Sequence, residues 1–437
     1  MYERRKVLEL FDKYREETDQ RIHHGIEQHR KGYGYITLQD EKGEPIRDVC
    51  IQLRQKTHEF RFGANLFMLG ELETEEKNEL YKQHFARLFN MATLPFYWDS
   101  TEPEKGALRY QADAPKLYRR PAIDKCVTFC KEHGIEPREH ALAYDHFFPD
   151  WLVGEDVATC KRELERRYKE IAGRYAEDIP TIEVTNEMFW KEGKTALYRA
   201  DDFMDWCYQK AEEHFPYNHL TINDAQPEAF KNFYGNMSAY YLQIERLLKA
   251  GRRVDAIGMQ YHMMCRSAET EYEFTRPYYD PLKLYAVLDR YSDFGKPLQI
   301  TEMTIPCFSD RAEDEQLQAD ILEQVYSLFF SHPNMEQIIY WNLPDGYAYG
   351  AKQGDMTTGE NRFFGGLLRV DLSPKPAFER LEELIHHRWH TDATVTTDKQ
   401  GRAVFKGFYG DYEAEINGKK LSLTLKKGKA NEFSFHI

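Results

Sequence analysis

The chain has 437 residues, 41% of them hydrophobic, and a formal net charge of −14. This length allows one large domain plus a small one, and the apolar fraction excludes wholesale disorder. The negative charge argues against a nucleic-acid partner, which requires a basic footprint, and disfavours other acidic partners unless a local basic cleft binds them.

The N-terminal residues, the lengths of the apolar runs and the cysteines indicate the cellular compartment of the protein. Residues 1–24 contain no apolar run of the length that a signal peptide requires, and no segment approaches the roughly 18 apolar residues of a membrane span. We therefore expect a cytoplasmic protein without a membrane partner. The seven cysteines are scattered and odd in number, which favours free thiols over a disulfide framework.

Three segments flank a central region in chain order. Residues 1–32 are charged and periodic, which predicts an amphipathic surface helix. Residues 33–59 form two β-patterned runs around a turn at residues 40–43. Residues 389–437 alternate with period two between glycine-marked turns. We expect the segments 33–59 and 389–437 to pack together as one small antiparallel β-domain, since isolated hairpins are marginal in water.

The central residues 60–388 alternate short apolar strands with helices. The candidate strands cover residues 60–65, 88–92, 138–143, 181–186, 219–223, 255–261, 298–302 and 337–341. Eight such units in about 320 residues indicate a closed parallel (β/α)8 TIM barrel, an α/β fold. A doubly wound sheet is the alternative, but it usually carries a glycine-rich nucleotide loop, which this sequence lacks.

Two carboxylates follow strands of this barrel, where catalytic groups are found. Glu187 follows the fourth strand directly after Asn186, and Glu302 ends the seventh. Two carboxyl groups about 5–5.5 Å apart suit glycoside hydrolysis, because one attacks the anomeric carbon while the other protonates the leaving oxygen. Such proximity raises the pKa of one of them, which then keeps its proton near neutral pH. The alternative is a pair of ordinary salt-bridged glutamates.

Other strand ends disfavour that alternative because they add groups suited to a sugar. Asn223 follows the fifth strand, Gln260 and His262 the sixth, and Trp341 the eighth. Asn186 would donate its amide to the 2-hydroxyl of the sugar, a contact that strengthens in the transition state.

The segment around the end of the third strand contains residues of the types that bind metal ions. His140, Asp145 and His146 resemble a ligand cluster, but successive strand residues point to opposite sides. We therefore expect His140, Tyr144 and Asp145 to bind substrate, Trp151 to stack on a sugar face, and neither a metal nor another cofactor to take part.

The motifs around these residues resemble glycoside hydrolase family 10, the xylanase family, from about residue 60 to residue 387. TIEVTNEMF is similar to the family's acid/base segment and LQITEMTI to its nucleophile segment. The resemblance implies that Glu187 is the acid/base and Glu302 the nucleophile. VDAIGMQYHM is similar to the strand-six segment, so Gln260 and His262 would contact the reacting sugar and the nucleophile.

Two departures from the family pattern concern specificity. The strand-two loop carries apolar and aromatic residues 94–98 where the family has a lysine and a glutamate that bind the sugar beyond the scissile ring. Thr304 replaces the acidic residue that would orient His262. We expect a retaining hydrolase of a neutral plant β-glycan or its oligosaccharides that is poor on linear polymer. The alternatives are a barrel glycosidase with another sugar specificity or exo action, and a carbohydrate-binding barrel without turnover.

Overall fold

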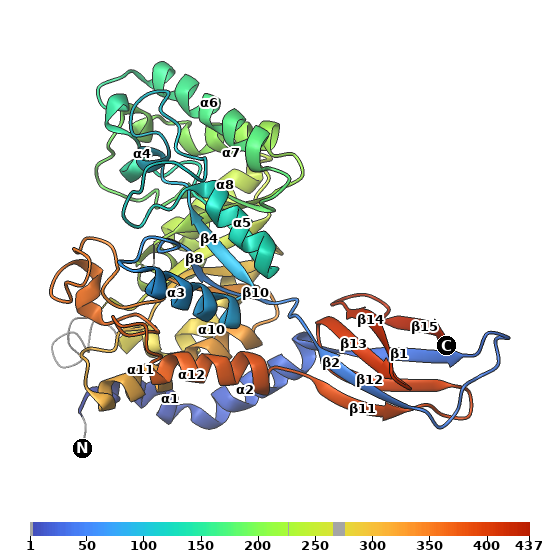
Figure 1. Cartoon of the computed structure of the whole chain (residues 1–437). Helices are drawn as coiled ribbons and strands as arrows, with labels where there is room; N and C mark the ends of the chain where they lie inside the picture. The colour runs from blue at the N-terminus through green and yellow to red at the C-terminus, as the bar shows by residue number, and fades with distance from the viewer. Residues whose placement is uncertain (1–2, 226, 265–275) are drawn as a thin grey trace.

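The computed structural model describes residues 3–225, 227–264 and 276–437 (Figure 1). Its central body is a closed barrel of eight parallel strands, which confirms the predicted fold class. The strands are β3 (Arg61–Asn65), β4 (Met91–Pro95), β5 (Glu136–His140), β6 (Thr181–Asn186), β7 (His219–Asp224), β8 (Ala256–His262), β9 (Leu298–Thr304) and β10 (Met335–Tyr340). They follow one another around the barrel in chain order, and β10 closes it by pairing with β3.

Helices cover the outside of the barrel and bury their apolar stripes against it. They are α3 (Glu75–Leu88), α5 (Ile123–His133), α6 (Val157–Tyr175), α7 (Phe203–His214), α8 (Ala239–Lys249), α10 (Pro281–Tyr291), α11 (Ala312–Ser331) and α12 (Pro376–Glu383). The predicted second strand begins too early because α3 runs through Leu88, which is buried and therefore looks like the start of the strand. No helix among the described residues is long and apolar enough to cross a bilayer.

The N-terminal segment is helical but broken. A 3₁₀ turn (Glu3–Leu8) leads into α1 (Glu9–Lys13) and α2 (Arg15–His29), and α2 packs against α11. Val7, Leu8 and Phe11 are buried in the barrel's hydrophobic core, so this segment is an integral part of the barrel's outer layer.

A separate β-domain projects from one side of the barrel (Figure 1). One of its sheets has the order β12-β1-β15 and the other β11-β2-β13-β14. The strands are β1 (Lys31–Gln39), β2 (Cys50–Gln55), β11 (Asp392–Thr396), β12 (Arg402–Phe408), β13 (Gly410–Ile416), β14 (Lys419–Leu425) and β15 (Glu432–His436). The two sheets share a hydrophobic core that includes Ile36, Leu53 and Phe405. Strands β1 and β15 pair in parallel, unlike the antiparallel arrangement expected.

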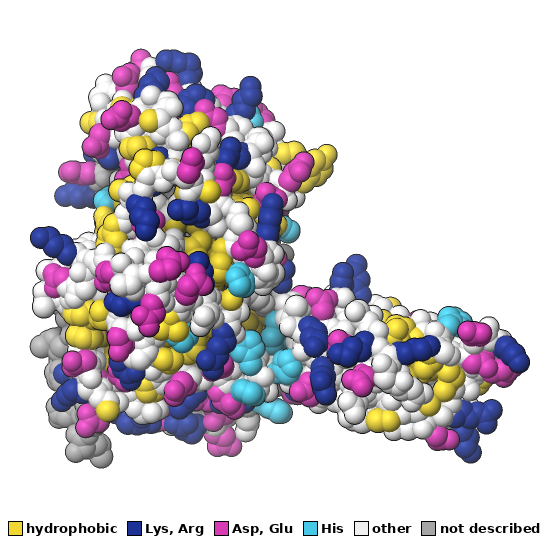
Figure 2. Space-filling view, viewed as in Figure 1, with side chains coloured by type: hydrophobic (Ala, Val, Ile, Leu, Met, Phe, Trp, Pro, Cys, Tyr) yellow, Lys and Arg dark blue, Asp and Glu magenta, His cyan; other side chains and the backbone are white. Residues whose placement is uncertain are grey.

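Charges of both signs intermingle over the face of the molecule shown in Figure 2, and histidines gather where the β-domain meets the barrel.

Candidate active site

A cavity of about 600 Å³ opens where the barrel strands end at their C-terminal side. Eight of the residues expected from the sequence to form the site line it: Glu187, Glu302, Asn186, Gln260, His262, Trp341, His140 and Tyr144. The closed barrel explains this convergence, because parallel strands deliver the residues at their carboxyl ends to one rim.

Glu302 is buried at the floor of the cavity, where both of its oxygens have partners. Asn223 Nδ2 donates to Oε1 at 3.1 Å, and His262 Nε2 lies 3.1 Å from Oε2. The other ring nitrogen of His262 lies 2.9 Å from Thr304 Oγ1. Burial lowers the pKa of His262, so the ring is neutral. The Thr304 hydroxyl can donate to Nδ1, so that the Nε2–H of His262 points at Glu302. Thr304 thus orients His262, as an acidic residue would in the family pattern.

Glu187 lies on the loop that follows β6, and three side chains hold its carboxylate. Gln260 Nε2 donates to Oε1 at 2.9 Å, while the Tyr144 hydroxyl and Trp190 Nε1 donate to Oε2, the latter at 3.0 Å. The backbone φ of Glu187 is 53°, in the left-handed region that is costly for a residue with a side chain. Such strained residues cluster at functional sites.

An amide network joins the two carboxylates. Asn186 Oδ1 accepts from Asn223 Nδ2 at 2.9 Å and from Gln260 Nε2 at 3.2 Å. Since Asn223 also donates to Glu302 and Gln260 to Glu187, one chain of hydrogen bonds runs between the two acids. With its oxygen occupied, the Asn186 amide nitrogen is the group left to donate to a sugar hydroxyl.

His140, which lines the cavity, belongs to a buried charged cluster. Its Nδ1 lies 2.9 Å from Glu183 Oε1, and its Nε2 lies 3.1 Å from the Tyr97 hydroxyl. Arg138 pairs with the other oxygen of Glu183. Burial alone would lower the pKa of His140, but the contact with Glu183 outweighs it and raises the pKa above its ordinary value. The positive charge of His140 in turn opposes the rise in the pKa of Glu302.

Three residues that we expected to bind substrate lie elsewhere. Asn223 is fully buried beneath the cavity, so it is a positioning residue. The Asp145 carboxylate accepts from the Thr195 hydroxyl at 2.5 Å and from the backbone N–H of Thr195 at 3.2 Å, so it anchors the loop after β6. Trp151 Nε1 donates to the Glu102 carbonyl at 3.1 Å. A 3₁₀ turn at Asp145–Phe147 turns the chain away from the strand direction that the expectation assumed.

The sequence reading missed the role of Trp190, which donates to Glu187. Trp190 is 53% exposed, at the rim of the cavity. The feature of the sequence that could have indicated this role is the position of Trp190, three residues after Glu187 on the same loop.

The protonation of the two acids differs from the simple expectation. Burial raises the pKa of Glu302 to about 8, and the nearby Glu187 adds in the same direction. In the free protein, therefore, the buried group at the floor of the cavity holds the proton. A hydrolytic step instead requires a proton on the group that faces the leaving oxygen and an ionised nucleophile.

Glu302→Gln should therefore stabilise the fold relative to the wild type, increasingly as the pH rises from 4.5 to about 8. A carboxyl group whose pKa is raised on folding from 4.5 to about 8 stabilises fully below the unfolded value and loses that contribution as the pH rises toward the folded value. The loss at pH 7 is on the order of 3 kcal/mol, which the uncharged glutamine avoids. Urea unfolding at pH 5 and pH 8 would measure it. An equal difference between variant and wild type at both pH values would contradict the raised pKa.

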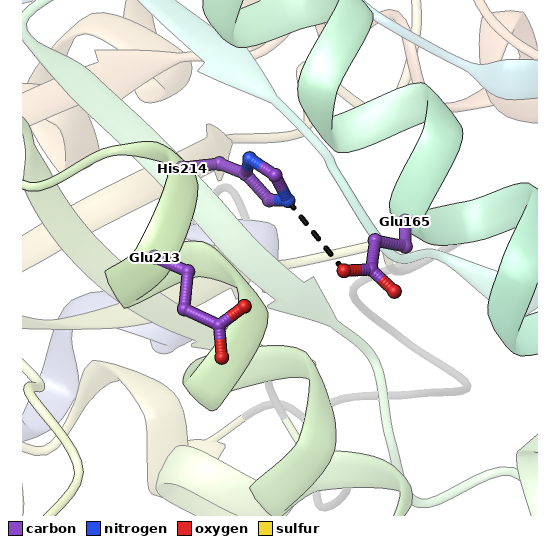
Figure 3. A group of neighbouring side chains, drawn as sticks. All are labelled: Glu165, Glu213 and His214. Carbon is purple, nitrogen blue, oxygen red and sulfur yellow. Dashed lines mark ion pairs between the residues drawn. The ribbon is translucent and has the colours of Figure 1, made fainter.

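A second cluster of acidic and imidazole groups lies on the outer helices (Figure 3). Glu165 of α6 lies near Glu213 and His214 of α7, with His214 Nε2 3.9 Å from Glu165 Oε1. Lys210 Nζ lies 2.9 Å from Glu165 and 2.8 Å from Glu213. The lysine ammonium pairs with both carboxylates and occupies the place between them, so these residues form an ion-pair cluster.

A (β/α)8 barrel that presents two linked glutamates, one directly after β6 and one near the C-terminal end of β9, has the architecture of a glycoside hydrolase. The model of the glycosyl hydrolase family 10 matches residues 55–383, and the chain belongs to this family. The match includes every residue of the site described above.

Individual proteins resemble the chain at low identity. The anti-sigma-I factor RsgI6 of Acetivibrio thermocellus is 24% identical over 93% of this chain and 47% of its own length. Endo-1,4-beta-xylanase 1 of Arabidopsis thaliana is 24% identical over 80% of this chain and 33% of its own length, so the chain spans about half or less of these relatives. The fold matches that of xylanase 10B from Thermotoga petrophila, solved in complex with xylobiose, with a TM-score of 0.58, 21% identity and coverage of 76% of this chain and 95% of that one.

Proposed function

We propose that this protein is a retaining glycoside hydrolase that cleaves β-glycosidic bonds in the neutral main chain of a plant glycan or its oligosaccharides. The observation that carries the proposal is the hydrogen-bonded link between Glu187 and Glu302 across one cavity, through Gln260, Asn186 and Asn223. Membership of glycosyl hydrolase family 10 and relatives named as xylanases support a β-1,4-linked xylan as the substrate class.

The proposed reaction has two displacements. In the first, the ionised Glu302 attacks the anomeric carbon while Glu187 gives its proton to the leaving oxygen, which forms a glycosyl ester on Glu302. In the second, Glu187 takes a proton from water, and the water oxygen attacks the same carbon and releases Glu302.

Each partner of the two acids has a part in these steps. His262 and Asn223 fix the oxygens of Glu302, so that attack needs little reorganisation. Tyr144, Trp190 and Gln260 stabilise the charge that Glu187 acquires when it loses its proton. No further cofactor is needed for this chemistry.

The strand-two region supports a preference for short substrates. Leu94, Phe96 and Trp98 are buried in the barrel core, so of this stretch Tyr97 alone lines the cavity. The Phe96 ring packs against Tyr175. Tyr97 stands here in place of the two charged hydrogen-bonding groups that the family pattern would place beyond the scissile ring.

We expect efficient hydrolysis of an aryl β-xylobioside and poor hydrolysis of linear xylohexaose. Hydrogen bonds to charged groups contribute about 1.5–3 kcal/mol each, so losing two of them lowers kcat/KM for the longer chain by about a hundredfold or more. The test compares kcat/KM for the two substrates. Failure to hydrolyse any β-xyloside would contradict the proposed substrate class, whereas efficient hydrolysis of xylohexaose would contradict only the preference for short substrates.

A further inference from the structure

Two adjacent arginines, Arg119 and Arg120, line the cavity beside the two glutamates. They lie on the long loop that follows β4 and ends at α5, away in sequence from the strand ends that supply the acids. The φ of Arg119 is 62°, a left-handed conformation that is costly for arginine and allows two consecutive side chains to reach one cavity.

Arg119 fastens this loop to the neighbouring loop after β10. Its Nη1 donates to the Tyr347 carbonyl and lies 3.3 Å from Asn342 Oδ1. The Asn342 amide in turn donates to Glu360 Oε2 at 3.1 Å. Arg119 is 5% exposed, so it is a positioning residue that sets the place of the next side chain.

The contacts of Arg120 differ from those of Arg119. Its guanidinium carbon lies 3.9 Å from the centre of the Tyr97 ring, and its Nη1 donates to the Arg119 carbonyl at 3.0 Å. Within the described part of the chain it forms no ion pair with a carboxylate, and Asp99 affects it only through space. A guanidinium has five N–H donors in a planar fork, so most of the hydrogen-bonding capacity of Arg120 is unused by the protein.

An unpaired guanidinium that is half-buried loses part of its hydration without gaining an ion pair, which is costly. Burial lowers the pKa of Arg120, which reflects the same cost. A carboxylate brought by a ligand would remove the cost, since its two oxygens match the guanidinium fork with two parallel charge-assisted hydrogen bonds. A neutral sugar hydroxyl offers no charge and no such pair. Without a cation at this place, the Glu187 and Glu302 carboxylates would repel an anionic ligand.

The position of Arg120 also indicates which part of a ligand it reaches. Tyr97 lies between Arg120 and the inner wall, with its hydroxyl on His140 and its ring 6.2 Å from that of Tyr144, which bonds Glu187. Arg120 is therefore linked to Glu187 through two aromatic rings, those of Tyr97 and Tyr144. A group bound to it belongs to a sugar next to the one that reacts.

We propose that Arg120 binds a carboxylate on the glycan, that is, a uronic acid on a sugar adjacent to the scissile ring. This inference rests on the proposed function and specifies its substrate: a neutral β-linked main chain with an acidic branch or end. The overall charge of −14 disfavours acidic partners in general, and Arg120 supplies the local positive charge that overrides it.

The experiment compares two xylo-oligosaccharides that differ in one group: one carries a glucuronic acid branch next to the bond to be cleaved, and the other is the same compound with that carboxyl reduced to an alcohol. For the wild type we expect kcat/KM to be about ten- to a hundredfold higher for the acid. In Arg120→Gln this ratio should fall to near one, and in Arg120→Lys it should fall part of the way, because the charge remains but the fork is lost. Arg47→Gln, on the exposed surface of the β-domain, is the matched control and should keep the wild-type ratio.

Binding gives a readout that does not depend on turnover. Calorimetry with Glu302→Gln and the same two oligosaccharides should show the preference for the acid, and the further change Arg120→Gln should remove it. A wild-type ratio of one or below, or an equal loss on both compounds in Arg120→Gln, would overturn the inference. If the Glu302→Gln protein prefers the acid while the wild type hydrolyses no β-xyloside, the carboxylate site stands and the proposed hydrolase function fails.

Discussion

Glu302→Ala should abolish hydrolysis of every glycoside, including those with the best leaving groups. The variant has no group to attack the anomeric carbon from the floor of the cavity, and a neighbouring water cannot be held by a methyl side chain. We expect kcat/KM to fall by more than about 10⁴-fold, since no two-step path remains. Initial rates on 2,4-dinitrophenyl β-xylobioside, for which leaving-group protonation is unimportant, would measure this loss.

The matched control is Glu336→Ala. Glu336 is also a partly buried glutamate, hydrogen-bonded to Gln299 at 2.6 Å, but it lies at the start of β10, the opposite end of the barrel from the cavity. This variant should keep the activity of the wild type per folded molecule. Activity of Glu302→Ala within tenfold of the wild type would remove Glu302 from the role of nucleophile.

Glu187→Ala should lower the rate of hydrolysis by an amount that depends on the leaving group of the substrate. On an unactivated oligosaccharide we expect kcat to fall by about 10²–10⁴-fold, the usual contribution of a general acid. On the dinitrophenyl glycoside the first displacement should survive, because that leaving group departs without a proton. The second displacement then limits the rate, since no general base activates water.

Azide separates the two acids by the stereochemistry of its product. In Glu187→Ala the anion should enter the space left by the carboxylate, speed the second displacement and give a β-glycosyl azide. In Glu302→Ala any azide adduct should be the α-anomer, formed by a single displacement from the opposite face. A β-azide from Glu302→Ala, or none from Glu187→Ala, would reverse or remove the assignment of roles.

The barrel was predictable because its signal is local. Most of the buried strands are short apolar runs between helices, although β5 (Glu136–His140) is polar, and the closed order follows once eight such units are present. The carboxyl ends of β6 and β9 then place Glu187 and Glu302 at one rim without further information. The amide of Asn186 beside Glu187 follows from the same strand.

Other features depend on tertiary structure that leaves no local pattern. Asp145 was expected in the site, but a 3₁₀ turn after β5 points its carboxylate at the backbone of another loop. The pKa of Glu302 depends on burial by surrounding elements, so spacing could not tell which acid holds the proton. Arg120 reaches the cavity from a long loop whose sequence has neither strand nor helix periodicity.

The stereochemistry of hydrolysis tests the two-step reaction at Glu187 and Glu302 most directly. Proton NMR during the first minutes of hydrolysis of an aryl β-xylobioside would show which anomer of the free sugar forms before mutarotation. Two inversions at one carbon predict that the β-anomer appears first and the α-anomer grows in later. If the α-anomer appears first, water attacks directly, and Glu302 is not a nucleophile.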